Sequence, residues 1–368
     1  MAKSIISVIG GTGLQGGGVV NALLAQGEFK VRVASRNPAS DAARAHAARD
    51  VEVVHADLLD PGSLVAAFEG AYGAFVVTNV WDPTQGAREE EIGAAAVGAA
   101  REAGVEHLIW STLPDAEKLS GGRRKVMHFS GKAHVDAVVR NAGFARHTFV
   151  QAPMYFQTFL GQMAPQPLPD GGRGWAVPMD PSKRVIHAGD VSEVGKAVAA
   201  AFSARGRLPN GNVLAVCGGI YSWNDFVLTL RALGHDVEIV RVPAEAYDRS
   251  FPGAPEIRET FQYFEEQTYF GPQREGPIAA ANALVPGGFT GRSQGLPGAG
   301  TSARPDQCSR RSRSSRAGHD GSRNRSPSRR LHGLGLQVVP ANELLALRIG
   351  GAPRLPGDGR VVRRPAFW

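Results

Sequence analysis

A glycine-rich run near the start of the chain has the spacing that a phosphate-binding loop needs. An apolar run of strand length precedes it, and a helical pattern follows directly. Such a turn brings the backbone close to a pyrophosphate, and the free amides of the next helix hold the phosphates. A turn that only joins a strand to a helix is the alternative. The sequence predicts a dinucleotide site formed by Gly10, Gly11, Thr12, Gly13, Leu14, Gln15 and Gly16.

The end of the second predicted strand carries a cation where many dinucleotide sites carry an acid. Arg36 lies about twenty residues after Gly16, where an Asp or Glu would accept the hydroxyls of the adenosine ribose in an NAD site. A guanidinium cannot accept these bonds, but it fits a 2′-phosphate with two parallel hydrogen bonds. NADP(H) is therefore the predicted cofactor, with Asn37 and Ser40 as further hydrogen-bonding groups. The alternative is an arginine that only faces solvent.

Two further strand ends place residues at the same predicted edge of the sheet. Asp57 and Leu58 follow the third strand, where the adenine ring would lie and where a carboxylate could accept its amine. Thr78 and Asn79 close the fourth strand and would line the path of the ribose and nicotinamide. Asp57, Thr78 and Asn79 are also of types that are ordinary in turns, so both interpretations stay open for them.

Proteins of this type that transfer hydride often use a tyrosine and a lysine four residues apart on one helix, with a serine after the fifth strand. Here His128 stands in place of the tyrosine, while Lys132 and Ser111 are present. These three are the catalytic candidates, but a helix-surface histidine without a catalytic role is the favoured interpretation. The sequence thus favours a protein that is not an enzyme, without deciding the question. Two cysteines, Cys217 and Cys308, are too few for a structural zinc site, so no metal is expected.

Strand-length apolar runs alternate with helical patterns through the first 151 residues. This alternation requires crossover connections and predicts an α/β fold: a Rossmann-type, doubly wound parallel sheet. Asp60 followed by Pro61 predicts a helix start. The predicted strands are 4–9, 30–35, 51–56, 74–78, 107–111 and 147–151, and the predicted helices are 17–25, 41–49, 63–68, 88–103 and 128–141.

The chain divides by composition into three parts. Residues 1–151 are predicted to form the NADP-binding domain, and residues 152–290 a smaller C-terminal α/β lobe that contains a strand and helix at 184–200. Residues 291–368 are rich in Arg, Gly, Ser and Pro without apolar period, which predicts disorder. A shifted reading frame would produce a sequence of this composition, and we favour it over an evolved basic tail.

The positive charge of the chain is concentrated at one end. The formal net charge is +7, yet residues 291–368 hold 15 arginines, no lysine and four acidic residues. Residues 1–290 are therefore mildly acidic, which argues against nucleic-acid binding through the core. No run of about 18 apolar residues predicts a membrane span. We expect a cytoplasmic protein, or a nuclear one as well if the source is eukaryotic.

Several blocks of the chain resemble the NmrA-like family of atypical short-chain dehydrogenase relatives. They are GGTGLQG at 10–16, VRVASRNP at 31–38, FVVTNVWD at 75–82, HFSGK at 128–132, PMYFQ at 153–157 and FPGAPEI at 251–257. The resemblance implies NADP(H) held by the glycine loop, Arg36, Asn37, Thr78, Asn79, Lys132, Tyr155 and Phe156. It also implies a redox sensor that acts through a protein partner, such as a transcription factor or signalling enzyme. The Arg-rich end departs from the family pattern.

Two functions therefore compete. The favoured one is a non-catalytic, NADP(H)-responsive regulator, since a complete cofactor site stands beside a missing tyrosine. The alternative is an NADPH-dependent reductase of quinone-like or carbonyl compounds, with Met154, Tyr155, Phe156 and Phe159 around the substrate. Nucleic-acid binding could rest only on the arginines of the C-terminal segment. A homodimer is a further expectation.

Overall fold

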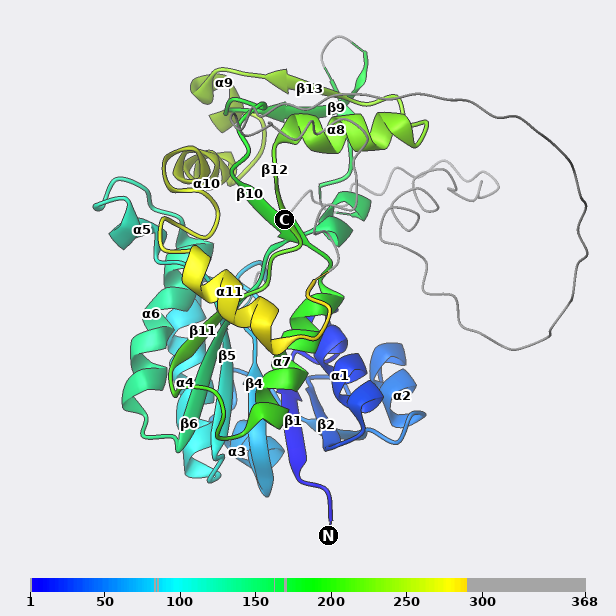
Figure 1. The fold of residues 1–368 in the computed structure, drawn as a ribbon, viewed down its shortest axis with the longest axis vertical. Coiled ribbons are helices and arrows are strands. Elements are labelled where there is room, and N and C mark those ends of the chain that lie inside the picture. Colours follow the sequence, from blue (N-terminus) through cyan, green and yellow to red (C-terminus); the bar gives the residue numbers. More distant parts are fainter. Residues whose placement is uncertain (1, 83, 85, 162, 169–170, 290–368) are drawn as a thin grey trace, which may run out of the picture.

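A parallel sheet forms the centre of the molecule, as predicted. The computed structural model describes residues 2–82, 84, 86–161, 163–168 and 171–289. Seven parallel strands pair in the order β11-β6-β5-β4-β1-β2-β3 (Figure 1). The strand order reverses beside β1, which opens a crevice at the carboxyl edge. The strands are β1 (Ile5–Ile9), β2 (Lys30–Ser35), β3 (Glu52–His55), β4 (Ala71–Val76), β5 (His107–Thr112), β6 (Arg146–Gln151) and β11 (Asn212–Ala215).

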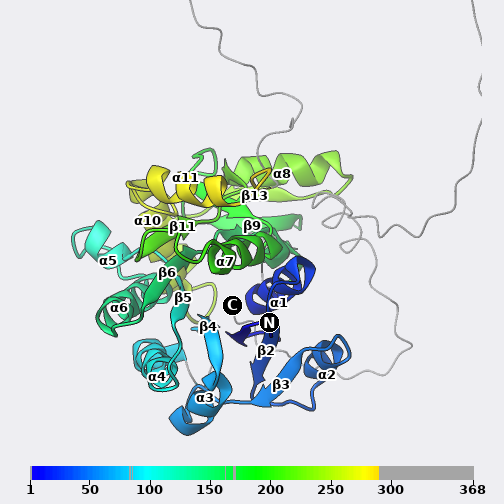
Figure 2. The same ribbon diagram turned by 60° about the horizontal axis from the view of Figure 1, so that its bottom comes forward.

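Helices cover both faces of this sheet (Figure 2). Apolar side chains of α1 (Leu14–Gln26), α7 (Ser192–Ala204) and α11 (Glu275–Leu284) pack on one face. Those of α3 (Pro61–Phe68), α4 (Glu89–Glu102) and α6 (Met127–Asn141) pack on the other. The predicted doubly wound, Rossmann-type fold is therefore confirmed.

The predicted helix start at Asp60 is also confirmed. The Asp60 carboxylate accepts hydrogen bonds from the amides of Gly62 and Ser63, and Pro61 occupies the first helical position of α3. At α2 (Asp41–Ala47), which connects β2 to β3, the Ser40 hydroxyl accepts a bond from the Ala43 amide in the same way. Both caps satisfy amides that a helix start leaves without partners.

A second part of the molecule lies above the carboxyl edge of the large sheet (Figure 1). It contains two three-stranded sheets, β12-β10-β7 and β13-β9-β8. Its core is largely aromatic and includes Trp175, Trp223 and Phe261. Its elements are β7 (Met154–Tyr155), β8 (Gln166–Pro167), β9 (Arg173–Val177), β10 (Ile186–Gly189), β12 (Gly219–Tyr221), β13 (Glu238–Arg241), α5 (Ala116–Leu119), α8 (Trp223–Ala232), α9 (Ala244–Asp248) and α10 (Ala254–Gln267), with a 3-10 turn at Phe156–Leu160 after β7. Another 3-10 turn, Gly86–Arg88, precedes α4 in the large-sheet part.

The chain after residue 151 contributes to both parts. β11 pairs with β6 as the outermost strand of the large sheet, and α7 and α11 cover its face. The strand and helix predicted at 184–200 are β10 and α7, so the first belongs to the upper part and the second to the large sheet. The two parts are thus tied together by repeated crossings of the chain.

Helices α1 and α7 approach so closely that glycine is required at their contact. A Cβ on Gly195 of α7 would lie 2.1 Å from the carbonyl oxygen of Gly18 in α1. A Cβ on Gly18 would lie 3.2 Å from the Cα of Ser192. This backbone contact fixes α7, and through it β10, relative to the helix that follows the glycine loop.

None of the helices in the described part of the chain is long and apolar enough to cross a bilayer. The predictions made for residues 291–368, including their disorder, lie outside the described residues.

We predict that Gly195→Ala lowers the free energy of unfolding by about 3 kcal/mol, because the added methyl group overlaps backbone atoms that cannot rotate away. Urea denaturation would measure this loss. Gly98→Ala is the matched control: Gly98 is an exposed glycine of α4 with no heavy atom within 4 Å of the added methyl. It should raise the stability by up to about 1 kcal/mol. Equal effects of both changes would contradict the tight contact between α1 and α7.

Candidate functional site

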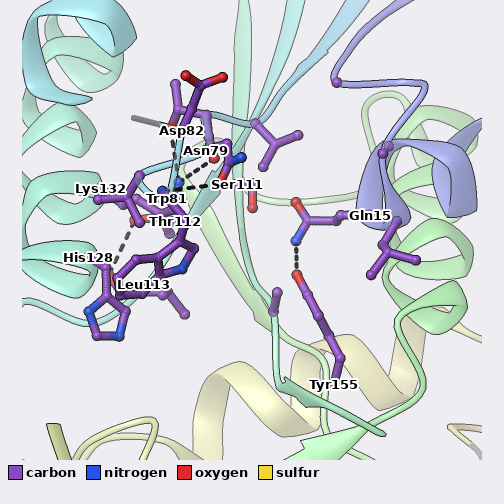
Figure 3. A pocket seen from close by; sticks show the side chains of 18 of the residues that line it. Gln15, Asn79, Trp81, Asp82, Ser111, Thr112, Leu113, His128, Lys132 and Tyr155 are labelled. Carbon is purple, nitrogen blue, oxygen red and sulfur yellow. Dashed lines mark hydrogen bonds between the residues drawn. The ribbon is translucent and has the colours of Figure 1, made fainter. Parts of the chain in front are cut away.

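A cavity of about 540 Å³ lies between the large sheet and the upper part of the molecule. The glycine loop and the ends of β2, β4 and β5 line one side. Residues of α6, β7 and α10 also line the cavity. In Figure 3, Gln15 and Tyr155 point toward one another across the pocket from Lys132 and His128. The cavity therefore occupies the carboxyl edge of the sheet, where parallel α/β folds bind ligands.

The glycine loop forms a cradle that side chains would fill. Gly10 has a φ of 76°, a conformation that glycine adopts without strain. The Gly13 amide donates to the Gly10 carbonyl at 2.9 Å, and a Cβ on Gly16 would lie 2.2 Å from that same oxygen. Thr12, Leu14 and Gln15 also line the cavity. All seven predicted loop residues are therefore brought together, with six of them at the cavity wall.

The start of α1 offers unsatisfied amides to an anion. Its N-cap, Gly13, has no side chain that could cap the helix, and no acidic residue lies in the first turn. The first amides of a helix have no partner within the helix, and its N-terminus carries a partial positive charge. The cradle therefore fits the pyrophosphate of a dinucleotide.

Arg36 lines the cavity directly after β2, where the sequence predicted a cation. Its side chain is 57% exposed, and its Nη1 lies 2.9 Å from Oδ2 of Asp82. The other two residues predicted beside it are bound to nearby backbone instead. Asn37 Oδ1 accepts a bond from the Ala39 amide at 3.0 Å, and Ser40 caps α2.

Of the two residues predicted around the adenine ring, Leu58 lines the cavity and Asp57 does not. Leu58 and Ala56 line the cavity. Asp57, between them, turns its carboxylate to the backbone, where Oδ1 accepts a bond from the Leu59 amide at 2.9 Å. An apolar surface is thus present at this position, while the predicted carboxylate contact remains a prediction.

Lys132 is held in a buried polar cluster. Its Nζ donates to the carbonyl oxygen of Thr78 at 2.8 Å, to the Thr78 hydroxyl at 2.9 Å and to Oε1 of Glu89 at 2.5 Å. The Thr78 hydroxyl also donates to Glu89. The side chains of Lys132 and Glu89 are only 10% and 5% exposed. An ammonium group has three donors, so protein atoms already satisfy all of them.

Glu89 is one of the partners of cavity-wall residues that sequence analysis missed, as are Glu256 and Asp82. It begins α4 as the first of three consecutive glutamates, and acids are favoured at any helix N-terminus. Their types alone do not show which of the three turns inward. Its Oε2 is buried without a hydrogen-bond partner among the described residues.

His128 is fixed by neighbours from both parts of the molecule. Its Nδ1 lies 3.0 Å from Oε1 of Glu256 on α10, and its ring lies 4.9 Å from that of Trp81, which follows β4. Burial alone would raise the pKa of Glu256, but the bonds from His128 lower it below its usual value. The imidazole lines the cavity and is only 13% exposed, so it does not lie on the helix surface as predicted. Its lack of a catalytic role stays a prediction.

The other predicted residues of this region divide between the cavity and the core. Ser111, which is 2% exposed, and Asn79 line the cavity. Tyr155 also lines it, and its hydroxyl accepts a bond from Gln15 Nε2 at 2.7 Å (Figure 3). Burial raises the pKa of the Tyr155 phenol well above its usual value, so it stays neutral. Phe156 packs against Tyr221 instead.

The end of the cavity that faces the upper part is aromatic. Phe129 of α6 packs against Tyr269, with ring centroids 5.2 Å apart, and Phe261 and Phe264 of α10 complete this wall. Tyr269 donates its hydroxyl to the Ala152 carbonyl at 3.1 Å. The cavity thus joins a phosphate cradle to an apolar chamber. No group of three or more His, Cys, Asp or Glu in the described residues could hold a metal ion.

Comparison with known proteins identifies the family. The model of the NmrA-like family matches residues 2–291. The chain belongs to the NmrA-like family. The predicted resemblance is therefore confirmed, and it extends over the large sheet, the cavity and the upper part.

Relatives of this NmrA-like chain carry names of oxidoreductases. The NmrA-like family domain-containing oxidoreductase himF of Aspergillus japonicus is 38% identical over 159 residues, which cover 42% of this chain and 48% of that protein. The similarly named malD of Malbranchea aurantiaca is 35% identical over 179 residues, covering 47% and 53%. The matches span about half the length of these curated relatives.

Solved structures share the fold. NmrA, a negative transcriptional regulator crystallised in complex with NADP, is 26% identical with a TM-score of 0.64, covering 78% of this chain and 93% of that chain. NmrA has also been crystallised with NAD. Triphenylmethane reductase of Citrobacter sp., complexed with NADP(H), has a TM-score of 0.61 at 20% identity, covering 79% and 96%, which shows a common fold.

We predict that Glu89→Gln lowers the free energy of unfolding by about 3 kcal/mol, because it leaves the Lys132 ammonium buried beside a neutral group. The double variant Glu89→Gln, Lys132→Met should lose less than the sum of the single losses, since neither charge then remains. Chemical denaturation of the native chain, the two single variants Glu89→Gln and Lys132→Met, and the double variant would measure this. Glu91→Gln, in the exposed pair with Arg88, should change stability little. Additive losses would show that the buried pair does not interact.

We predict a pH-dependent cost from Asp136, one turn after Lys132 on α6. Burial raises the pKa of its carboxyl from 3.8 to about 7, and hydrogen bonds from Thr112 and Trp110 only partly oppose this. The folded state therefore binds more protons, and stability falls as the pH rises from about 4 to about 7. Asp136→Asn should gain about 1 to 3 kcal/mol over the native chain at pH 8 and much less at pH 4. A pH-independent difference would contradict the buried carboxyl.

Proposed function

We propose that this chain binds NADP(H) in the cavity and reduces small apolar acceptors such as quinones or aromatic carbonyl compounds. The observation that carries the proposal is the continuity of one cavity from the glycine cradle to the aromatic chamber. Phosphates need a polar cradle and an apolar ring system needs an apolar wall, and this one cavity contains both.

The residues of the cradle divide the work of binding. The amides at the start of α1 take the pyrophosphate, and Arg36 takes the 2′-phosphate of the adenosine. Leu58 and Ala56 pack against the adenine ring. When bound, NADPH supplies a hydride at its nicotinamide ring, which we place toward Ser111 and Tyr155.

The aromatic chamber selects the acceptor. Phe129, Phe261, Phe264 and Tyr269 exclude water and favour a flat apolar molecule. The neutral Tyr155 phenol holds a proton at this end, and the His128 imidazole holds another when it is protonated. Acceptors that take their proton from solvent need neither group. The names of himF and malD support an oxidoreductase.

A second candidate is a nucleotide-responsive regulator without turnover. The occupied Lys132 favours it, because an ammonium bound to Thr78 and Glu89 cannot also activate a proton donor. His128, which stands where a tyrosine would act, is bound to Glu256. Under this candidate, NADP(H) would change the binding of a protein partner, as the fold it shares with the transcriptional regulator NmrA suggests. A cytoplasmic or nuclear location, and a homodimer, stay predictions.

The deciding experiment is a calorimetric titration with NADPH, NADP, NADH and NAD, followed by an assay for NADPH oxidation with a series of quinones. Saturable binding with sustained oxidation supports the reductase. Binding of NADP(H) without oxidation of any acceptor leaves the regulator. The absence of binding to all four nucleotides would overturn both.

We predict that Gly13→Asp weakens the binding of all four nucleotides by about 100-fold, because a carboxylate at the N-cap takes the amides and repels phosphate. The backbone of Gly13 is extended, with φ −93° and ψ 179°, and a Cβ there makes only an ordinary contact. The variant should therefore keep or raise the melting temperature. Unchanged nucleotide affinity would show that the phosphates bind elsewhere.

A further inference from the structure

The two loops on either side of the glycine cradle are joined by one ion pair. Arg36 follows β2 and Asp82 follows β4, and β1 lies between these strands. Arg36 Nη1 and Asp82 Oδ2 are 2.9 Å apart, and both residues line the cavity. The pair therefore crosses the end of β1, on the side of the cavity where the adenosine phosphate is expected.

Asp82 is positioned before any ligand arrives. Its Oδ1 accepts bonds from the Thr84 amide at 2.9 Å and from the Thr84 hydroxyl at 2.6 Å. These bonds lower the pKa of Asp82 below its usual value, and Arg36 lowers it further. Oδ2 is thus presented to Arg36 as an ionised, oriented acceptor, with a side chain only 11% exposed.

A 2′-phosphate must compete with this carboxylate. The guanidinium that would bind the phosphate already holds an oriented anion, and an ionised carboxylate close to a phosphate repels it. A nucleotide with a free 2′-hydroxyl meets neither cost, because it leaves the ion pair intact. The charge on Asp82 therefore acts against NADP(H) and not against NAD(H).

We propose that Asp82 is a specificity-determining residue that lowers the preference of this chain for NADP(H) over NAD(H) by competing for Arg36. The inference rests on the proposed nucleotide site. It predicts that a chain with an arginine after β2 still binds NAD(H).

The test is a binding measurement that does not depend on turnover. Asp82→Asn keeps an oxygen that can accept the bonds from Thr84 but removes the charge that holds Arg36. We expect the Kd for NADP to fall about 5- to 20-fold and the Kd for NAD to change less than about 3-fold, as measured by isothermal titration calorimetry. In an Arg36→Gln background the same change should improve NADP binding much less, because the competition is gone.

Asp41→Asn is the matched control. Asp41 begins α2 close to the same loop, but its carboxylate pairs with Arg44 and is almost fully exposed. It should leave both affinities nearly unchanged, which separates the competition for Arg36 from a general loss of negative charge. Melting temperatures of all variants would show that each one is folded.

Four results would overturn the inference. Asp82→Asn could weaken both nucleotides equally, which would make Asp82 a support for the loop. It could strengthen NADP equally with and without Arg36, which would show only long-range repulsion. If the native chain binds neither nucleotide, the proposed function fails and the inference fails with it, whereas binding of both with no effect of Asp82→Asn refutes the inference alone.

Discussion

The structure depends on a backbone approach that admits no side chain. The carbonyl oxygen of Gly10 lies where a Cβ of Gly16 would be, so the first turn of α1 can rest directly on the end of β1. Two residues later along the same helix, Gly18 meets Gly195 of α7 in another backbone contact. Because α7 continues the chain from β10, the geometry of the phosphate cradle and the placement of the upper part share one helix. A substitution that moves α1 would therefore disturb both ends of the cavity.

Gln15 makes this dependence visible at the site. It lies in the first turn of α1, next to the amides of the cradle, and it donates to the hydroxyl of Tyr155 in β7. Its Oε1 is buried without a hydrogen-bond partner among the described residues, which is a cost unless a ligand or water supplies a donor. The contact between the two parts of the molecule is thus made beside the proposed nucleotide site. A change in α1 at the cradle would therefore also reach β7, which lines the other end of the cavity.

Sequence patterns predicted most of the large sheet, because buried parallel strands and the helices between them leave strong apolar signals. The prediction began β4 at Ala74, three residues later than Ala71, because Tyr72 and Gly73 do not read as a buried strand by themselves. It also could not place β11. That strand is short, and only its pairing with β6 shows that it belongs to the large sheet.

The site was predicted less completely, for a physical reason. Backbone cradles leave a trace in glycine spacing, and six of the seven predicted loop residues line the cavity. Side-chain partnerships leave none when the partners are distant in sequence, as with Arg36 and Asp82 or Lys132 and Glu89. Asn37, Ser40 and Asp57 are of the right types for a ligand, but their oxygens accept bonds from nearby amides. Residue type thus indicates what a side chain can bind, while the fold decides what it binds first.

The buried pair of Lys132 and Glu89 changes how the lysine should be interpreted. A lysine on this helix, four residues after the position of a missing tyrosine, suggests a remnant of proton-relay chemistry. Yet its ammonium joins the end of β4, through Thr78, to the start of α4, and breaking such a pair would leave a buried charge. A structural role in the cavity wall therefore accounts for this lysine without a proton relay. Under the proposed function this restricts the acceptor: Lys132 is not available to activate a proton donor, so the compounds best reduced are those whose reduced oxygen can be protonated by water. Quinones meet this condition better than simple ketones, whose oxygen needs its proton as the hydride arrives.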